Sequence, residues 1–411
     1  MIRKSIYLAA ALSVLLLAAC GDKDKNKQSA PAARQQAIAI DDTLRQRLGD
    51  FATRPRVKGK FGLYVYDLTA DKPVYAMNET EPIPSASCMK LLSGVAGLHL
   101  MGTDYAYPVS VYMRGQLRGD TLHGDIGFRA GLDPQLMSSD LPTYAKALRS
   151  KGIRAVKGKC YVDLALKNPV TSETHWYPWD LSFSRYGLLY KGAPRVVREL
   201  KAALRAQGIA VRDSQMVLDH VPRGSRVVYR HYQSILTVTQ RMWKNSSNTQ
   251  ATAMLYTIGH RVSPHESPTA AGVRYLRWFL KNDIGEADKR LVVHDGCGLC
   301  TYNRLSARSL VAILRYAYRD KQIFPILYDQ LSIAGVDGTL VRQMNRPGLR
   351  GRIHAKTGTL SHPYGISSLA GYCKAPNGHL LAFAIMDSEM SVLDAHVLQR
   401  KLCEELVKSN R

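Results

Sequence analysis

Apolar residues recur along this chain with two spacings, and each spacing predicts a different kind of element. At both ends they recur every three to four residues, which predicts a helix over 40–51 and another over 398–406. Apolar stretches at 61–67 and 74–77 predict a hairpin, and stretches at 369–373 and 380–385 flank Asn377-Gly378, a strong hairpin turn. Further helices are predicted near 91–98, 267–280 and 310–317, and the second has a good start in Ser267 as N-cap followed by Pro268. We therefore expect an α+β fold, an antiparallel sheet with helices packed on it.

From about position 103 the pattern changes. Val109, Val111 and Met113 alternate with polar residues, and a turn at Gly119-Asp120 follows. Two helix-glycine-strand stretches come later, so we predict that 103–229 form a smaller α/β domain inserted into a domain made of 39–102 and 230–411. A short strand is expected at 291–293. It leads into Gly296-x-Gly298, but the third glycine of a dinucleotide fingerprint is absent, so no nucleotide site is predicted.

The N-terminus carries an export pattern. Arg3 and Lys4 precede an apolar run over 6–19, which is short for a membrane span and typical of a signal peptide. The run ends in Leu17-Ala18-Ala19-Cys20, which resembles the bacterial lipobox. We predict a lipoprotein signal peptide over 1–20 with lipidation at Cys20, the alternative being a plain signal peptide. A polar tether over 21–38 would follow, because its composition cannot bury a core.

Composition narrows the partners. The 411 residues carry a formal net charge of +24, which favours anionic surfaces. The basic residues are spread along the chain with no nucleic-acid motif, so nucleic acid is not expected, and an anionic membrane or a carboxylate-rich cell wall fits better. Six cysteines remain besides Cys20, and a local disulfide between Cys297 and Cys300 is one possibility. That pair lacks a second half-site for zinc, so neither a metal nor a cofactor is predicted.

A serine and a lysine stand where one helix is predicted to begin. Ser87 precedes Lys90 by three residues, so both lie on one face, and the positive end of the helix favours a developing alkoxide. This pair can form a nucleophile with its own base if burial keeps the lysine poised. Cys88 points away from the face of Lys90, so we expect it to be a packed helix residue.

Two further motifs follow in order. Ser246-Ser247-Asn248 lies between one predicted helix and a second one beginning at Ala251, and Lys356-Thr357-Gly358 ends a short strand at 353–355. Ser-x-x-Lys, Ser-x-Asn and Lys-Thr-Gly in this order are the signature of penicillin-recognising serine acyl-transferases. Each motif is weak evidence alone, but the ordered set on suitable elements is strong.

Acyl transfer assigns each residue a role. Ser87 would attack, Lys90 would take its proton, and Ser246 would relay a proton to the leaving group. Asn248 would hold Lys90 and the substrate amide. Lys356 and Thr357 would meet a terminal carboxylate, and Gly358 would let the strand approach closely. The N–H groups of Ser87 and Thr359 are the expected oxyanion donors.

Other stretches point to one family. Asp295-Gly296-Cys297-Gly298-Leu299, the runs 334–340 and 355–360, and His231-Tyr232-Gln233-Ser234 resemble the class C low-molecular-mass penicillin-binding proteins, over about 62–386. Ser247 stands where the family often has Asp, and Cys297 and Cys300 where it often has Ser. The interval between Ser87 and Ser246 is shorter than in typical relatives, which implies a shortened insertion.

The resemblance implies a function. Members are D-alanyl-D-alanine carboxypeptidases and endopeptidases, so we expect a serine carboxypeptidase acting on peptidoglycan stem peptides, with endopeptidase activity left open. It would form an acyl-enzyme on Ser87, be acylated by β-lactams, need no cofactor, and face the periplasm or cell wall from its lipid anchor. The resemblance also implies that Asp180, in Trp176-Tyr177-Pro178-Trp179-Asp180, meets the amino end of a diamino-acid side chain. The alternative is a structural aromatic cluster with a solvated Asp180.

Two other functions remain open at this point. A serine β-lactamase shares all three motifs, and a non-catalytic wall-binding lipoprotein would keep the fold without acylating. The intact motifs argue against the second alternative. Neither the oligomeric state, nor the preferred third residue of the stem peptide, nor the membrane that holds the anchor follows from the sequence.

Overall fold

The computed structural model describes residues 39–409, except 55–57, 174 and 181–185. The predicted signal peptide, Cys20 and the tether lie outside the described residues. The described residues belong to one compact unit, which contains two six-stranded sheets. Among the described residues, no helix combines the length and the apolarity needed to span a bilayer.

The first sheet has the strand order β2-β1-β12-β11-β10-β9, and every neighbouring pair is antiparallel. Both predicted hairpins are confirmed, β1 with β2 and β11 with β12. The sheet is built from sequence-distant segments, because β1 from the N-terminal part pairs with β12 near the C-terminus. Its strands are β1 Lys60–Asp67, β2 Lys72–Met77, β9 Ser332–Ile333, β10 Ile353–Leu360, β11 Ile366–Lys374 and β12 Leu380–Ser388.

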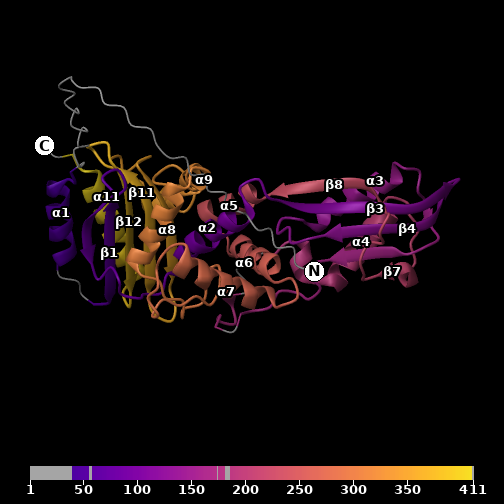
Figure 1. Cartoon of the computed structure of the whole chain (residues 1–411), viewed down its shortest axis with the longest axis horizontal. Helices are drawn as coiled ribbons and strands as arrows, with labels where there is room; N and C mark the ends of the chain where they lie inside the picture. Colours follow the sequence, from indigo (N-terminus) through magenta and orange to yellow (C-terminus); the bar gives the residue numbers. More distant parts are fainter. Residues whose placement is uncertain (1–38, 55–57, 174, 181–185, 410–411) are drawn as a thin grey trace, which may run out of the picture. The chain divides into compact units, whose positions relative to one another are not determined.

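Helices cover both faces of this sheet, so strands β11 and β12 are buried almost throughout. On one face, α1 (Asp42–Thr53) and α11 (Val392–Val407) lie beside the sheet (Figure 1) and share a hydrophobic core with it. The opposite face packs on α2 (Met89–Met101) and α8 (Ala307–Arg319). Behind them lie α5 Ile235–Lys244, α6 Asn248–Val262, α7 Pro268–Asn282 and α9 Ile323–Gln330. The predicted α+β class and both terminal helices are confirmed.

The second sheet comes from the stretch predicted to be inserted. Its order is β7-β6-β4-β3-β8, with β5 beside β4. The predicted hairpin forms, and Gly119 takes the positive φ of +59° that its turn requires. The strands are β3 Ala106–Arg118, β4 Thr121–Ala130, β5 Ala155–Val156, β6 Cys160–Leu164, β7 Met216–Val217 and β8 Arg226–Ser234; the helices are α3 Leu141–Arg149 and α4 Ala193–Ala206.

This sheet has its own hydrophobic core, which also takes in Ala253 and Tyr256 from α6. Strand β8 continues beyond position 229 to Ser234, whose hydroxyl accepts from the backbone N–H of Leu236 and caps α5. The second sheet therefore supports α5 and α6, the two helices that flank the Ser-x-Asn motif. The domain boundaries at 103 and 229 stay a prediction.

Several local predictions were wrong. Helix α6 begins at Asn248 rather than Ala251, and Lys356-Thr357-Gly358 lies inside β10 because its pairing with β11 continues to Leu360. The expected strand at 291–293 is only an isolated bridge between Val292 and Arg304. No disulfide joins Cys297 and Cys300; all six cysteines in the described part of the chain are buried free thiols.

Candidate active site

The three motifs meet where β10 passes the start of α2. Ser87 lies in a short 3₁₀ turn, Ala86–Cys88, and Lys90 lies in the first turn of α2. Ser246 lies in the turn between α5 and α6, and Asn248 is the first residue of α6. Hydrogen bonds join these residues into two clusters, one around Lys90 and one around Lys356 of β10. The structure therefore brings together the five residues to which the sequence assigned catalytic roles.

Lys90 is fully buried and surrounded by oxygen atoms. Its Nζ lies 2.8 Å from Ser87 Oγ, 2.8 Å from Asn248 Oδ1 and 2.6 Å from the carbonyl oxygen of Cys297. Burial lowers the pKa of Lys90 to about 8, against smaller opposing effects of Cys297 and Asp295. A neutral amine can donate to Asn248 and Cys297 and aim its lone pair at the Ser87 hydroxyl, which is the geometry of a general base.

Lys356 is also fully buried. Its Nζ donates to Ser246 Oγ at 2.8 Å and to the carbonyl oxygen of Thr357 at 2.6 Å. Burial, followed by repulsion from Lys90, lowers the pKa of Lys356 to about 7. Two poised lysines in one site are a strong indication of proton-transfer chemistry.

The backbone near the nucleophile is tightly constrained. A side chain at Gly358 would place its Cβ 2.7 Å from the carbonyl oxygen of Ser85 and 3.0 Å from the backbone N of Ser87. This agrees with the role predicted for Gly358, since only glycine lets β10 lie so close to the serine. Ala86 and Ser246 both have positive φ, 43° and 57°, and non-glycine residues in this region concentrate at functional sites.

The proposed carboxylate-binding residues follow along β10. Thr357 is buried, and its Oγ1 donates to Thr339 Oγ1 at 2.8 Å. Thr359 follows Gly358 on the same strand, and unlike Thr357 it is exposed. Cys88 is packed as expected: burial raises its pKa, and its Sγ donates to the carbonyl oxygen of Lys356 at 3.2 Å.

Asp180 has a local partner in this structure. It is only 5% exposed, its Oδ2 accepts from the backbone N–H of Tyr177 at 2.8 Å, and burial raises its pKa. In this conformation its carboxylate closes its own turn. Contact with an amino group of the stem peptide would use the other oxygen or a rearranged turn, and that role stays a prediction.

Sequence reasoning missed the loop that completes the Lys90 cluster. The Asp295–Leu299 stretch was recognised as a family feature, but nothing indicated that the Cys297 carbonyl would accept from Lys90. The indole Nε1 of Trp243 also donates to the Lys90 carbonyl at 2.8 Å and fixes the first turn of α2. The available signal was Asp followed by Gly-x-Gly, a pattern in which an aspartate often bonds the backbone of its own loop.

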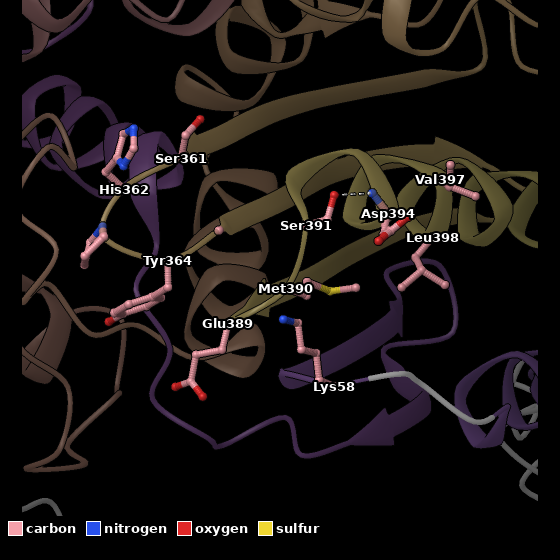
Figure 2. A pocket seen from close by; sticks show the side chains of 12 residues that line it. Lys58, Ser361, His362, Tyr364, Glu389, Met390, Ser391, Asp394, Val397 and Leu398 are labelled. Carbon is pink, nitrogen blue, oxygen red and sulfur yellow. Dashed lines mark hydrogen bonds between the residues drawn. The ribbon is translucent and has the colours of Figure 1, made fainter.

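Two other features bear on the site. Among the described residues, no three or more His, Cys, Asp or Glu side chains lie together in a way that could hold a metal ion. A cavity of about 760 Å³ opens beyond the β10–β11 turn, between Lys58, the turn residues 361–365 and the start of α11 (Figure 2). No residue of the three motifs lines it, so it is separate from the Ser87 site.

Comparison with known proteins identifies the class that this fold and site define. The chain matches the D-Ala-D-Ala carboxypeptidase 3 (S13) family over residues 44–186 and 190–405, and it belongs to that family. It is therefore a peptidase. A D-alanyl-D-alanine carboxypeptidase from an Actinomadura species is 23% identical, over 88% of this chain and 84% of the relative.

Solved structures share the fold. Penicillin binding protein 4 (dacB) from Haemophilus influenzae has a TM-score of 0.75 at 17% identity, covering 88% of this chain and 99% of that one. A predatory peptidoglycan endopeptidase from Bdellovibrio bacteriovorus has a TM-score of 0.58 at 14% identity, covering 86% and 96%. The resemblance to penicillin-binding proteins predicted from the motifs is confirmed.

Proposed function

We propose that this protein is a serine-type D-Ala-D-Ala carboxypeptidase that acts on peptidoglycan stem peptides through an acyl-enzyme on Ser87. The observation that carries the proposal is the 2.8 Å contact between Ser87 Oγ and the Nζ of a fully buried lysine whose pKa is lowered to about 8. A hydroxyl is a weak nucleophile alone and becomes effective beside a poised base. The family of the chain supplies the reaction class.

Acylation follows from the Lys90 cluster. Neutral Lys90 accepts the Ser87 proton as Oγ attacks the carbonyl carbon of the penultimate D-alanine. The ammonium that forms is stabilised by the Asn248 and Cys297 oxygens already facing Nζ. The backbone N–H groups of Ser87 and Thr359 are the proposed donors to the oxyanion, and the contact of Gly358 with Ser87 supports that placement.

Release of the leaving group follows from the Lys356 cluster. The C–N bond breaks as the amine of the terminal D-alanine takes a proton, which we assign to the Ser246 hydroxyl, re-protonated from Lys356. The terminal carboxylate would bind near Lys356, Thr357 and Thr359. Water then attacks the ester on Ser87. Its OH stays on the acyl carbon, its other proton restores the Ser87 hydroxyl as the ester C–O bond breaks, and the shortened peptide is released. If the leaving amine belongs to a second stem peptide, the same steps give endopeptidase activity, which a solved relative carries in its name.

β-Lactams are the expected covalent inhibitors. A solved relative, penicillin binding protein 4, is described in complex with a β-lactam, and another, the Bdellovibrio endopeptidase, as acylated by penicillin G. For this chain we expect a fluorescent penicillin to label the wild type and not Ser87→Ala. A stable label together with hydrolysis of a D-Ala-D-Ala peptide is the predicted result. Full peptide hydrolysis by folded Ser87→Ala would refute the proposal.

The same experiment separates the alternatives. A label that forms and is quickly lost would indicate a serine β-lactamase, since fast deacylation distinguishes that activity. Absence of label on folded wild type would favour a non-catalytic wall-binding lipoprotein.

We also propose that the protein is exported and held at a membrane by lipid on Cys20, with 21–38 as a tether and 103–229 as an inserted domain. The lipobox-like sequence supports the anchor, and the second sheet with its own core supports the domain. Labelled fatty acid incorporated into wild type and not into Cys20→Ala would test the anchor. None of the steps proposed here calls on a metal ion, so activity should survive a chelator.

A further inference from the structure

A single buried carboxylate organises the loop that faces Lys90. Asp295 is 1% exposed, and both of its oxygens are fully used by hydrogen-bond donors. Oδ1 accepts from the backbone N–H groups of Cys297 at 3.1 Å and Gly298 at 2.6 Å and from Asn303 Nδ2 at 3.1 Å; Oδ2 accepts from the backbone N–H of Cys300 at 2.8 Å and from Trp176 Nε1 at 2.8 Å. Four of these donors belong to the 295–303 loop itself, and the fifth comes from a distant segment.

The loop is seated directly on the catalytic turn. Gly298 has a φ of +85°, and a Cβ there would lie 1.8 Å from the carbonyl oxygen of Ala86, next to Ser87. The hydroxyl of Ser93 donates to the Gly296 carbonyl at 2.7 Å and fixes the loop on α2. The Cys297 carbonyl then accepts from Lys90 Nζ at 2.6 Å. A shift of this loop would therefore move one of the three oxygens that face Lys90 Nζ.

The fifth donor comes from the 175–180 loop, in the segment predicted to be inserted. Trp176 is 8% exposed and packs in the core that contains α2 and α8. The neighbouring His175 contacts His294, with ring centroids 4.7 Å apart, and Glu173 accepts from Thr269 at 3.1 Å. Among these contacts, the Trp176–Asp295 bond is the one that continues to the Lys90 cluster.

The other end of the same loop is open to solvent. Tyr177 and Trp179 stack at a centroid distance of 4.9 Å, and Trp179 is 49% exposed. The Trp179 ring also meets His362, in the turn that follows β10, at 6.4 Å. This exposed pair therefore stands next to the end of the strand that carries Lys356-Thr357-Gly358. Resting on the proposed function, the acyl side of a stem peptide lying along β10 would reach it.

We propose that Trp176 and Asp295 are positioning residues that couple the 175–180 loop to Lys90, so that engagement of the stem peptide by this loop sets the rate of acylation. Peptide contact at the exposed end of the loop holds Trp176 against Asp295, which holds the Cys297 carbonyl on Lys90. Recognition of the third stem residue is then expressed in kcat rather than in KM, because the interaction matters most when Lys90 takes the proton.

The charge of Asp295 gives the coupling a signature in pH. The ionisable groups that face Lys90 are Asp295, Cys297, Cys88 and Lys356. Asp295 raises the pKa of Lys90 against the effect of burial. Replacing Asp295 by Asn removes that charge, so the acid limb of the acylation rate should move to lower pH while the maximal rate falls. A merely structural role would lower the rate without moving the limb.

The test uses the whole protein and three variants. Asp295→Asn keeps Oδ1 as an acceptor but turns an amide N–H₂ toward Trp176 and Cys300. Trp176→Phe removes the indole donor. Tyr372→Phe is the control, because it removes a buried 2.8 Å bond to the Leu314 carbonyl in the same core without touching the site. The measurements are kcat and KM for two D-Ala-D-Ala peptides, with a diamino acid or alanine at the third position, and thermal unfolding.

We expect Trp176→Phe to lower kcat on the diamino peptide about tenfold, the loss of one hydrogen bond to a charged group, with little change in KM. The kcat advantage of the diamino peptide over the alanine peptide should shrink in both site variants. The double variant should lose no more of this advantage than either single one, and Tyr372→Phe should keep it.

Additive losses in the double variant, or an unchanged kcat advantage in folded Trp176→Phe, would overturn the coupling. An acid limb that stays in place in folded Asp295→Asn would do the same. Should Asp295→Asn not fold, Trp176→Phe alone decides. These outcomes differ from failure of the proposed function, in which the wild type itself would not hydrolyse either peptide.

Discussion

The two halves of the active site each contain a buried lysine, and the two lysines have different surroundings. Around Lys90, three oxygens face Nζ, and the nearby Asp295 opposes the effect of burial on its pKa. Two oxygens face the Nζ of Lys356. Burial is the main cause that lowers the pKa of Lys356, and repulsion from the charge of Lys90 lowers it further. Both residues are lysines, so the difference between their expected roles comes from the groups around each Nζ.

This difference explains a division of labour. The Lys90 cluster already contains acceptors for an ammonium, so it suits a base that gains a proton during the reaction. The Lys356 cluster lacks a carboxylate among the groups that act on its pKa, so an arriving substrate carboxylate would supply the missing negative charge. We therefore expect Lys90 to control the chemical step and Lys356 to control both binding of the terminal carboxylate and departure of the amine.

The largest effect should come from removing the base. Lys90→Met is expected to lower the rate of acylation by penicillin about 10²- to 10⁴-fold, the usual range for a general base. Stopped-flow or gel-based labelling of the variant beside wild type measures this. Retained acylation in a folded Lys90→Met protein would reverse the comparison and make Lys356 the base.

The next effect should come from removing Lys356, the proposed partner of the substrate's terminal carboxylate. Lys356→Met should lower kcat/KM for a D-Ala-D-Ala peptide about 10- to 100-fold, since a hydrogen bond to a charged group contributes roughly 1.5–3 kcal/mol. A peptide with a C-terminal amide in place of the carboxylate should lose activity with wild type and lose little more with the variant. If Lys356→Met lowered kcat/KM equally for the carboxylate peptide and the amide peptide, Lys356 would not bind the carboxylate.

A separate effect appears in stability. The pKa of Lys356 is about 7 in the folded protein and about 10.4 in an unfolded chain. Between these values the unfolded state binds more protons, so the free energy of unfolding of wild type should rise with pH from about 7 to 10. Lys356→Met lacks this term. Urea denaturation should find the variant more stable than wild type at pH 7, with a gap that narrows toward pH 10.

The same measurement sharpens the comparison between the two lysines. The contribution of Lys90 to the free energy of unfolding should begin to rise nearer pH 8. A gap between wild type and Lys356→Met that stays constant with pH would mean that Lys356 keeps its proton in the folded protein.

How much of this could be predicted from the sequence depends on the range of the interaction. The hairpin at Asn377-Gly378 and the helix capped by Ser267 were predicted correctly, because turn and cap preferences act within a few residues. The order Ser87, Ser246, Lys356 predicted the family for the same reason, since each motif is a short local pattern. The strand at 291–293 failed because its apolar residues pack in the core without a neighbouring strand to pair with.

The sequence by itself determined which side chains could react and on which elements they stand. Only the tertiary structure decided their protonation and aim, since the lowered pKa of each lysine comes from burial by segments far along the chain. The Cys297 carbonyl is the clearest case. It has no side-chain identity for a sequence pattern to show, and it reaches Lys90 only because Asp295 folds its loop and the Ala86–Cys88 turn receives it.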